Sequence, residues 1–595
     1  MKVLNKQNSL LNRLDMKKLT EYPLIKFVLF AGLMIVLASC SDHLDYQPKG
    51  VVTEDDLDNP EGAELLATAA YAQLGNSDWA FASHTTNWLY GSVRSDDAYK
   101  GGGSTADQGG MDRYERFQFI LTDQGEQHNV WIAFYEAISR ANRALALINT
   151  LDEADYPLKV ERQAEMRFLR AHNYFRLVMF FKNVPWIDEN VELEDVPTVS
   201  NREFTQDELW DKIAEDFQFG VDNLPEVQSQ VGRASSVAAA AYLARTRLFQ
   251  AYEQDEQHNV VNINNAHLEE VIQLADFVIG SGKHSLAEDY AENFLAEFDN
   301  GPESVFAIQH SQDDGTEEGR LNFEHGLNYN MAPGYGCCWF HVPSHNMVNA
   351  FQTSEDGLPL FDTFNDVMIS DPEDYVENNF DPRLSHTVGI PGHPYKYDPE
   401  FIYSAGWSRA PEIYGHHSNM KDVQHPESSA LRPFGPFFGS TKNVDIIRYS
   451  EVLLMKAEAL IELGRENEAL PYINQLRERA ANSTGRVLNA DGSEPATYNI
   501  QPYQPGVNID WNQATAREAL RWERRMEFAM ESWRFFDLVR WGIAAETLND
   551  YFEVERTRRS FLNDAFFQKN RDEYLPIPQQ EINLSEGLYQ QNPGY

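Results

Sequence analysis

The sequence predicts a mostly α-helical protein, a scaffold of packed helix pairs interrupted by a loop-rich insert. Two observations support this class. Apolar residues recur at spacings of three and four over most of the chain, as they do on the buried face of a helix. Between residues 300 and 442 this period fades, and Gly, Pro, aromatic and His residues crowd together. A loop-rich stretch of that length inside a helical protein is usually functional.

The helical segments follow one another along the chain. We expect them at residues 61–74, 129–151, 161–181, 235–252, 267–279, 446–480 and 514–548, with a short strand at 304–309. Ser235 is a favourable N-cap, and the small residues after it let a neighbouring helix approach closely. Gly464 divides residues 446–480 into two helices, and such Ala-rich pairs resemble tetratricopeptide (TPR) repeats. Because the spacing is irregular, we expect a TPR-like scaffold rather than a regular array.

The N-terminus is typical of a bacterial lipoprotein. In residues 1–39, lysines precede an uncharged apolar run of about twelve residues, fewer than the roughly 20 needed to cross a bilayer. Leu37–Cys40 resembles a lipobox, in which the Cys is acylated after cleavage. We therefore expect residues 1–39 to be a signal peptide, Cys40 to carry lipid and residues 40–60 to form a tether. The alternative is an ordinary signal peptide followed by an incidental Cys.

The charge of the chain excludes some functions. The sequence holds 49 Lys plus Arg against 92 Asp plus Glu, a formal net charge of −43. This charge repels nucleic-acid phosphates, so we expect no nucleic-acid partner. No phosphate loop, nucleophile elbow or dinucleotide fingerprint is present in the sequence, and we expect no cofactor.

Six segments, in order along the chain, resemble the SusD/RagB family of outer-membrane glycan-binding lipoproteins. They are Asn129–Asn142, Glu161–Ile187, Gly232–Phe249, Asp445–Gly464, Glu523–Gly542 and Tyr574–Ile582. The resemblance implies four irregular TPR-like helix pairs with an insert that carries the ligand site. We expect one helical part at 61–299, the ligand-binding insert at 300–442 and a second helical part at 443–595. It also implies a surface-exposed lipoprotein of the outer membrane that captures glycans and delivers them to a SusC-like TonB-dependent transporter.

A glycan site needs flat aromatic faces beside planar hydrogen-bonding groups, because sugars present both apolar C–H faces and hydroxyls. Two clusters in the sequence fit this description. The candidate residues are Asp78, Trp79, Trp88, Asp96, Asp97 and Tyr99 in the first cluster, and Tyr335, Cys337, Cys338, Trp339, Arg409 and Tyr414 in the second. For the three tryptophans the alternative is a place in the core. Arg534 and Arg540, beside helical tryptophans, are expected to be partners of buried acids.

Cys337 and Cys338 are adjacent, and once Cys40 is acylated they are the only thiols left in an oxidising compartment. A vicinal disulfide between them would make a rigid, flat, apolar patch on which a sugar ring could stack. The alternative is two free buried thiols. The family resemblance implies that a stretch like Gly334–Cys338 lies near the ligand.

These residues are also compatible with three other functions. A glycoside hydrolase needs two carboxylates about 5–9 Å apart, but the side chains of the neighbours Asp96 and Asp97 would diverge on a strand. The second alternative is a TPR-like scaffold that binds only protein. The third is a metal site at His416 and His417 or at His341 and His345, which we do not expect because an i,i+4 His pair without a following acidic ligand is a weak signal. The strong acidity favours a neutral glycan, such as a fructan or β-glucan, over alginate or sulfated chains.

Overall fold

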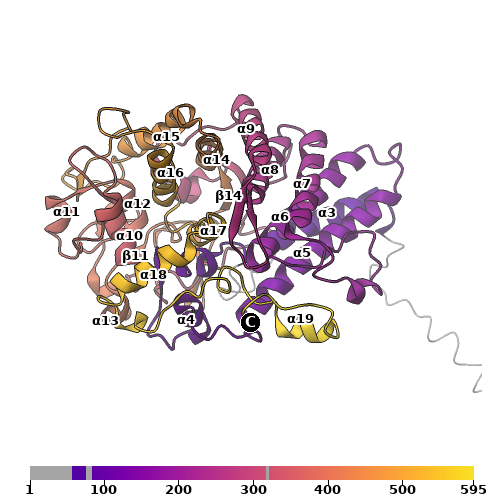
Figure 1. Cartoon of the computed structure of the whole chain (residues 1–595), viewed down its shortest axis with the longest axis horizontal. Coiled ribbons are helices and arrows are strands. Elements are labelled where there is room, and N and C mark those ends of the chain that lie inside the picture. Colours follow the sequence, from indigo (N-terminus) through magenta and orange to yellow (C-terminus); the bar gives the residue numbers. More distant parts are fainter. Residues whose placement is uncertain (1–56, 76–83, 316–319) are drawn as a thin grey trace, which may run out of the picture. The chain divides into compact units, whose positions relative to one another are not determined.

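The computed structural model describes residues 57–75, 84–315 and 320–595 of the chain. Pro60–Tyr595 form one compact unit that is mostly helical, which confirms the predicted class (Figure 1). Within these described residues, no helix is both long enough and apolar enough to cross a membrane. The predicted signal peptide, Cys40 and most of the predicted tether lie outside the described residues.

The longer helices form a continuous stack. They are α3 (Pro60–Leu74), α5 (Gly125–Thr150), α6 (Lys159–Phe181), α7 (Gln206–Asn223), α8 (Ser236–Ala251), α9 (Asn265–Gly280), α14 (Tyr449–Glu462), α15 (Glu466–Ala481) and α16 (Gln513–Glu527). Each helix from α3 to α9 packs on the one before it, and α9 packs on α14, which contacts both α15 and α16 (Figure 1). The irregular stack of consecutive helices is the TPR-like scaffold that the sequence predicts.

Small residues set the spacing in the middle of this stack. Ser235 caps α8 by accepting a hydrogen bond from the backbone N–H of Ala238 at 3.1 Å, as predicted. The run Ala238–Ala241 is fully buried. A Cβ added to Gly220 of α7 would lie 3.0 Å from the Cβ of Ala239, so the two helices are already as close as their side chains allow.

Two helix boundaries differ from the predicted ones. The helix expected from residue 446 begins at Tyr449, because residues 444–448 form a strand instead. The segment expected over 514–548 as one long helix or a pair of helices is three helices, α16, α17 (Arg534–Arg540) and α18 (Ala544–Glu555). Met530 and Ser532 take left-handed backbone conformations between the first two, which ends α16 and redirects the chain.

Shorter elements fill the insert and the lower edge of Figure 1. The remaining helices are α4 (Gly109–Arg116), α10 (His345–Ala350), α11 (Asp374–Glu377), α12 (Arg383–Thr387), α13 (Pro411–Tyr414) and α19 (Gln579–Leu584). The strands are β1 (Ala98–Gly101), β2 (Tyr252–Gln254), β3 (Val260–Ile263), β4 (Ser304–Ile308), β5 (Phe340–Pro343), β6 (Gln352–Thr353), β7 (Asn379–Phe380), β8 (Val388–Gly389), β9 (Pro394–Tyr395), β10 (Asp398–Ile402), β11 (Ser418–Asn419), β12 (Leu431–Phe434), β13 (Phe437–Ser440), β14 (Val444–Arg448) and β15 (Thr497–Tyr498).

Strand pairing joins the insert to the rest of the chain at three places. β5 pairs antiparallel with β1, with Gly101 opposite Phe340. β4, the strand predicted at 304–309, pairs antiparallel with β14. β7 pairs parallel with β15, so the insert is joined to the body of the protein at three points along its length.

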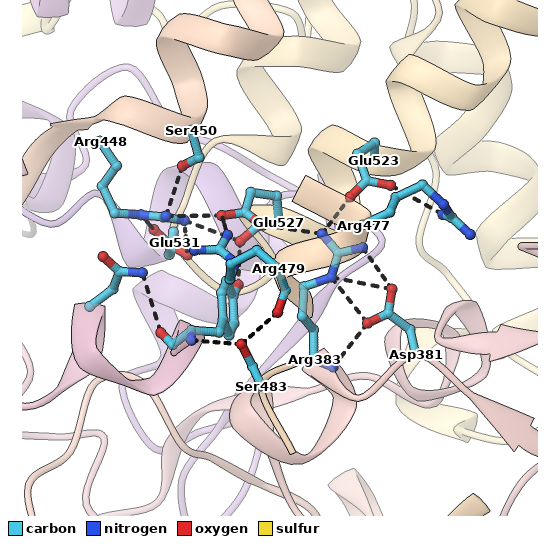
Figure 2. Close-up of polar contacts among 12 residues, drawn as sticks. Asp381, Arg383, Arg448, Ser450, Arg477, Arg479, Ser483, Glu523, Glu527 and Glu531 are labelled. Atoms are coloured by element: carbon cyan, nitrogen blue, oxygen red, sulfur yellow. Dashed lines mark hydrogen bonds and ion pairs between the residues drawn. The ribbon is translucent and has the colours of Figure 1, made fainter. Parts of the chain in front are cut away.

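A buried network of arginines and carboxylates joins the insert to the helices (Figure 2). Its centre is Glu527 of α16, whose carboxylate oxygens lie 3.1 Å from Arg383 Nη1, 3.0 Å from Arg448 Nη1 and 2.6 Å from Arg479 Nη2. Burial alone would raise the pKa of Glu527, but the three guanidinium groups lower it well below its usual range. Arg383 opens α12 in the insert and also binds Asp381 and Glu523. The network fixes the insert against the scaffold.

Candidate functional site

Half-buried aromatic side chains gather on the insert, and one of them, Tyr335, comes two residues before the first of the adjacent cysteines. Tyr335, Phe401, Trp407 and His425, here called the aromatic surface, are each partly exposed. The ring centroid of Phe401 lies 5.0 Å from that of Trp407, with 32° between the planes, and 5.0 Å from that of His425. Tyr335 lies 6.5 Å from Phe401. Neighbouring rings that share an exposed side can offer a stacking face to a sugar.

A buried aromatic floor holds these rings in place. The floor consists of Tyr329, Tyr395, Tyr403, Met420, Val423, Leu431 and Phe438. The segment that carries Tyr335 is joined to the one that carries Trp407, because the backbone N–H of Met331 donates to the carbonyl of Trp407 at 3.0 Å. The hydroxyl of Tyr335 donates to the carbonyl of Gln424. The rings are therefore rigidly supported from beneath and from the side.

The disulfide and one arginine complete the site. Cys337 and Cys338 are joined by a disulfide, with Cys337 partly exposed and Cys338 buried. Arg409 follows Trp407 by two residues, and its side chain is 39% exposed. Its Nη1 lies 2.8 Å from Oδ2 of Asp107, and the guanidinium has further N–H groups that could donate to a ligand. Along the chain, the disulfide thus comes directly after Tyr335 and Gly336, and Arg409 comes two residues after Trp407.

Other candidate residues do not face solvent. Trp88 and Trp339, both expected as stacking platforms, are 0% exposed. The indole N–H of Trp88 donates to the carbonyl of Glu324 and that of Trp339 to the carbonyl of His417, both at 3.0 Å. Tyr99 and Tyr414 are also fully buried. For these four residues direct contact with a ligand was the wrong expectation, because tertiary packing covers the Gly-rich and polar stretches on which they lie.

Asp96 and Asp97 are likewise committed to structure. Asp96 lies 3.0 Å from Arg525 and 2.9 Å from Arg534, and Asp97 lies 2.9 Å from Arg525. Both carboxylates are buried, so contact with a glycan is wrong for them too. Arg534 and Arg540 bind buried acids, as predicted. Asp78 and Trp79 lie outside the described residues.

These buried carboxylates predict a loss of stability in acid. Burial alone would raise their pKa values, but Arg525 and Arg534 lower the pKa of Asp96 to about 2, and His325 and His341 lower the pKa of Asp422 to about 2. The pKa of Glu458, opposed by Arg540, is also about 2. A depressed pKa stabilises the folded state above the ordinary value of 3.8 for Asp and 4.5 for Glu, and this contribution is lost as the pH falls towards 2.

We therefore expect the free energy of unfolding to drop by about 2 kcal/mol for each of these carboxylates below about pH 4.5. Urea denaturation followed by circular dichroism at pH values from 6 to 2.5 measures this change. Glu115, whose pKa burial raises to about 8, has the opposite sign: its protonation adds stability as the pH falls from about 8 to 4.5, so the expected loss is read between pH 4.5 and 2.5. A denaturation midpoint that stays constant down to pH 2.5 would contradict the assignment.

A separate cavity of about 100 Å³ lies where the insert meets the scaffold. Its lining includes Lys421, Arg448, Glu531 and Trp533. Lys421 and Arg448 both bind Glu531, at 2.8 and 2.9 Å, so these lining charges compensate one another. The cavity is too small for an oligosaccharide, and we place the candidate site on the aromatic surface instead.

Sequence reasoning missed Trp407 and Phe401, although a signal was present. Trp407 stands in a Ser-Ala-Gly-Trp-Ser-Arg stretch, outside every predicted helix and flanked by polar residues. No metal site is expected from the sequence. Among residues 57–75, 84–315 and 320–595, no three His, Cys, Asp or Glu side chains are grouped so that they could hold a metal ion.

Comparisons with known proteins agree with this fold. Residues 302–595 match the model of the SusD family, and residues 64–248 match a model described as starch-binding, associating with the outer membrane. Fold and matches together define a class of helical proteins associated with the outer membrane. The chain belongs to the SusD/RagB family within that class.

Three relatives show how far the similarity extends. SusD-like protein P2 of Formosa agariphila is 25% identical over 582 residues, which cover 96% of this chain and 99% of that protein. A solved SusD homologue from Bacteroides thetaiotaomicron has a TM-score of 0.68 at 21% identity and covers 91% of this chain and 99% of its own. Surface glycan-binding protein A from the same species, solved with laminarihexaose, has a TM-score of 0.64 at 20% identity, with 90% and 99% covered.

Proposed function

We propose that this chain is a surface lipoprotein that captures a neutral glycan on the aromatic surface and passes it to a SusC-like TonB-dependent transporter. The observation that carries the proposal is the aromatic surface of Tyr335, Phe401, Trp407 and His425, to which the chain adds the disulfide two residues after Tyr335 and Arg409 two residues after Trp407. Lipid on Cys40 would hold the protein at the outer membrane. We propose no catalysis, because the neighbouring acids Asp96 and Asp97 are both bound to arginines.

A neutral β-glucan is the glycan class that we propose. The formal charge of −43 disfavours polyanionic chains such as alginate. A structurally similar protein was solved with laminarihexaose, so laminarin, with levan as the fructan alternative, is the first probe. Soluble protein that begins at Ser41 can be tested by affinity electrophoresis and calorimetry.

Trp407→Ala is expected to weaken laminarin binding by about 1–3 kcal/mol, because it removes a stacking ring from the aromatic surface. Isothermal titration calorimetry with the soluble protein measures the change. Trp511→Ala is the matched control: Trp511 is also half-buried, but it packs on Tyr503 outside the insert. Equal affinity of wild type and Trp407→Ala, or an equal loss in both variants, would contradict the proposal.

The transporter role can be separated from glycan binding. If the chain were a TPR-like scaffold that binds only protein, glycan affinity would be absent and transporter recovery would depend on other surfaces. We expect Trp407→Ala to recover the transporter in a pull-down as well as wild type does, while its glycan affinity falls. Release of reducing sugar from laminarin by the purified protein would instead show an enzyme.

A further inference from the structure

One fully buried lysine binds the same loop as the arginine of the candidate site. Lys100, at the end of β1, is 0% exposed. Its ammonium group donates to three backbone carbonyls of the loop that follows, those of Gly101 at 3.1 Å, Ser104 at 3.0 Å and Asp107 at 2.5 Å. Within the described part of the chain Lys100 forms no ion pair with a carboxylate; the rings of Phe340 and Tyr414 lie 5.2 and 5.6 Å away.

This arrangement fixes the shape of the loop at residues 101–107. Three carbonyls of an irregular loop converge on one point, and buried carbonyls need donors. An ammonium group is the side chain that supplies three donors from a single atom. Gly101 and Gly102 take left-handed conformations, and the N–H of Gly102 donates to the carbonyl of Trp339 at 2.8 Å. The loop is thereby tied to the residue that follows the disulfide.

Arg409 binds the same loop. The carboxylate of Asp107 accepts from the N–H of Gly103 and from Arg409 Nη1, each at 2.8 Å. A Cβ added to Gly103 would lie 3.1 Å from the guanidinium carbon of Arg409, so the guanidinium rests directly on the loop backbone. Lys100 and Arg409 therefore both bind the loop at residues 101–107, and Asp107 contacts both of them.

We propose that Lys100 is a positioning residue for glycan binding, which holds the 101–107 loop in the shape that aims Arg409 at the sugar beside Trp407. This inference rests on the proposed function and adds to it a residue that never touches the ligand. Arg409 makes directional bonds to hydroxyls only if its fork is held still. Lys100 supplies that rigidity through Asp107.

The test uses Lys100→Met, which keeps the length of the side chain and removes the donors. We expect laminarin binding to weaken about tenfold, the size of one charge-assisted hydrogen bond. Arg409→Ala should cause a similar loss. Because the two residues act in series, the double variant should also be about tenfold weaker rather than about a hundredfold. Multiplied losses in the double variant, or unchanged affinity of Lys100→Met, would overturn the proposal.

Hydrogen exchange reads the same effect without any glycan. In Lys100→Met, the amides of residues 101–107 should exchange about tenfold faster, while those of α5 stay unchanged. Unchanged exchange in the loop would overturn the proposal for Lys100, whatever the glycan binding of wild type. Failure of wild type to bind laminarin or levan would count only against the proposed function. If Lys100→Met does not fold, Lys100→Gln, which keeps one amide donor group, takes its place with the same criteria.

Gly103→Ala tests the contact between Arg409 and the loop separately from the contacts of Lys100. Its Cβ would displace the guanidinium of Arg409 and leave the three carbonyls on Lys100 in place. We expect affinity to fall as in Arg409→Ala, with loop exchange as in wild type. Wild-type affinity in Gly103→Ala would show that the position of Arg409 does not matter, and the role of Lys100 would then be only structural.

Discussion

Replacement of Glu527 by Ala is expected to destabilise the protein by about 3–5 kcal/mol, the cost of leaving buried charges without their partner. Arg383, Arg448 and Arg479 all bind this one carboxylate, and each is buried (Figure 2). Glu527 is itself 0% exposed, so water cannot take its place without rearrangement of the network. Glu527→Gln should cost nearly as much, because it keeps the shape but removes the charge.

Guanidinium denaturation at neutral pH measures this loss. The matched control is Glu468→Ala on α15: Glu468 pairs with Arg465 at 2.7 Å, but its side chain is 59% exposed. Exposed pairs add little stability, so this variant should unfold as wild type does. If Glu527→Ala unfolds at the wild-type midpoint, the network does not hold the insert in the way described above.

Replacement of Trp339 by Ala is expected to cost about 3–5 kcal/mol, as for other large buried aromatic side chains. The indole is 0% exposed and its N–H is bonded to the carbonyl of His417, so the variant loses packing and leaves an acceptor unpaired. Trp407→Ala removes a half-buried ring and should leave the denaturation midpoint close to that of wild type. The two tryptophans thus separate stability from binding.

Denaturation and calorimetry on the two variants together make the comparison. Trp339→Ala should lose stability, and if it still folds at low temperature it should keep measurable laminarin affinity. Trp407→Ala should keep stability and lose affinity. If Trp339→Ala lost affinity without losing stability, and Trp407→Ala lost stability without losing affinity, then Trp339 and not Trp407 would contact the glycan.

Helices could be predicted well because their signal is local. The apolar period and the N-cap Ser235 depend on neighbours in sequence, and α8 begins one residue after that cap. The start of α14 was misplaced because β14 depends on pairing with β4, some 140 residues earlier in the chain. The spacing of apolar residues within one segment does not reveal a strand partner that lies far away in the sequence.

The site was predicted only in part, for a related reason. Trp339 and Trp407 both stand near Gly and polar residues, yet one is buried and the other half-exposed. Their difference comes from β1, the 101–107 loop and the segment at 414–419, which cover Trp339 from distant parts of the chain. The family resemblance implied the neighbourhood of Gly334–Cys338, but no residue pattern could state which rings there reach the surface.

The way in which the insert is joined to the body limits how ligand preference can change. A chimaera that exchanged residues 300–442 with those of a relative would need to preserve the β5–β1 and β4–β14 pairings and the place of Arg383 beside Glu523 and Glu527. Those demands fall on residues far from any sugar. New specificity is therefore more accessible through point changes around Trp407 and Arg409 than through recombination of the whole segment.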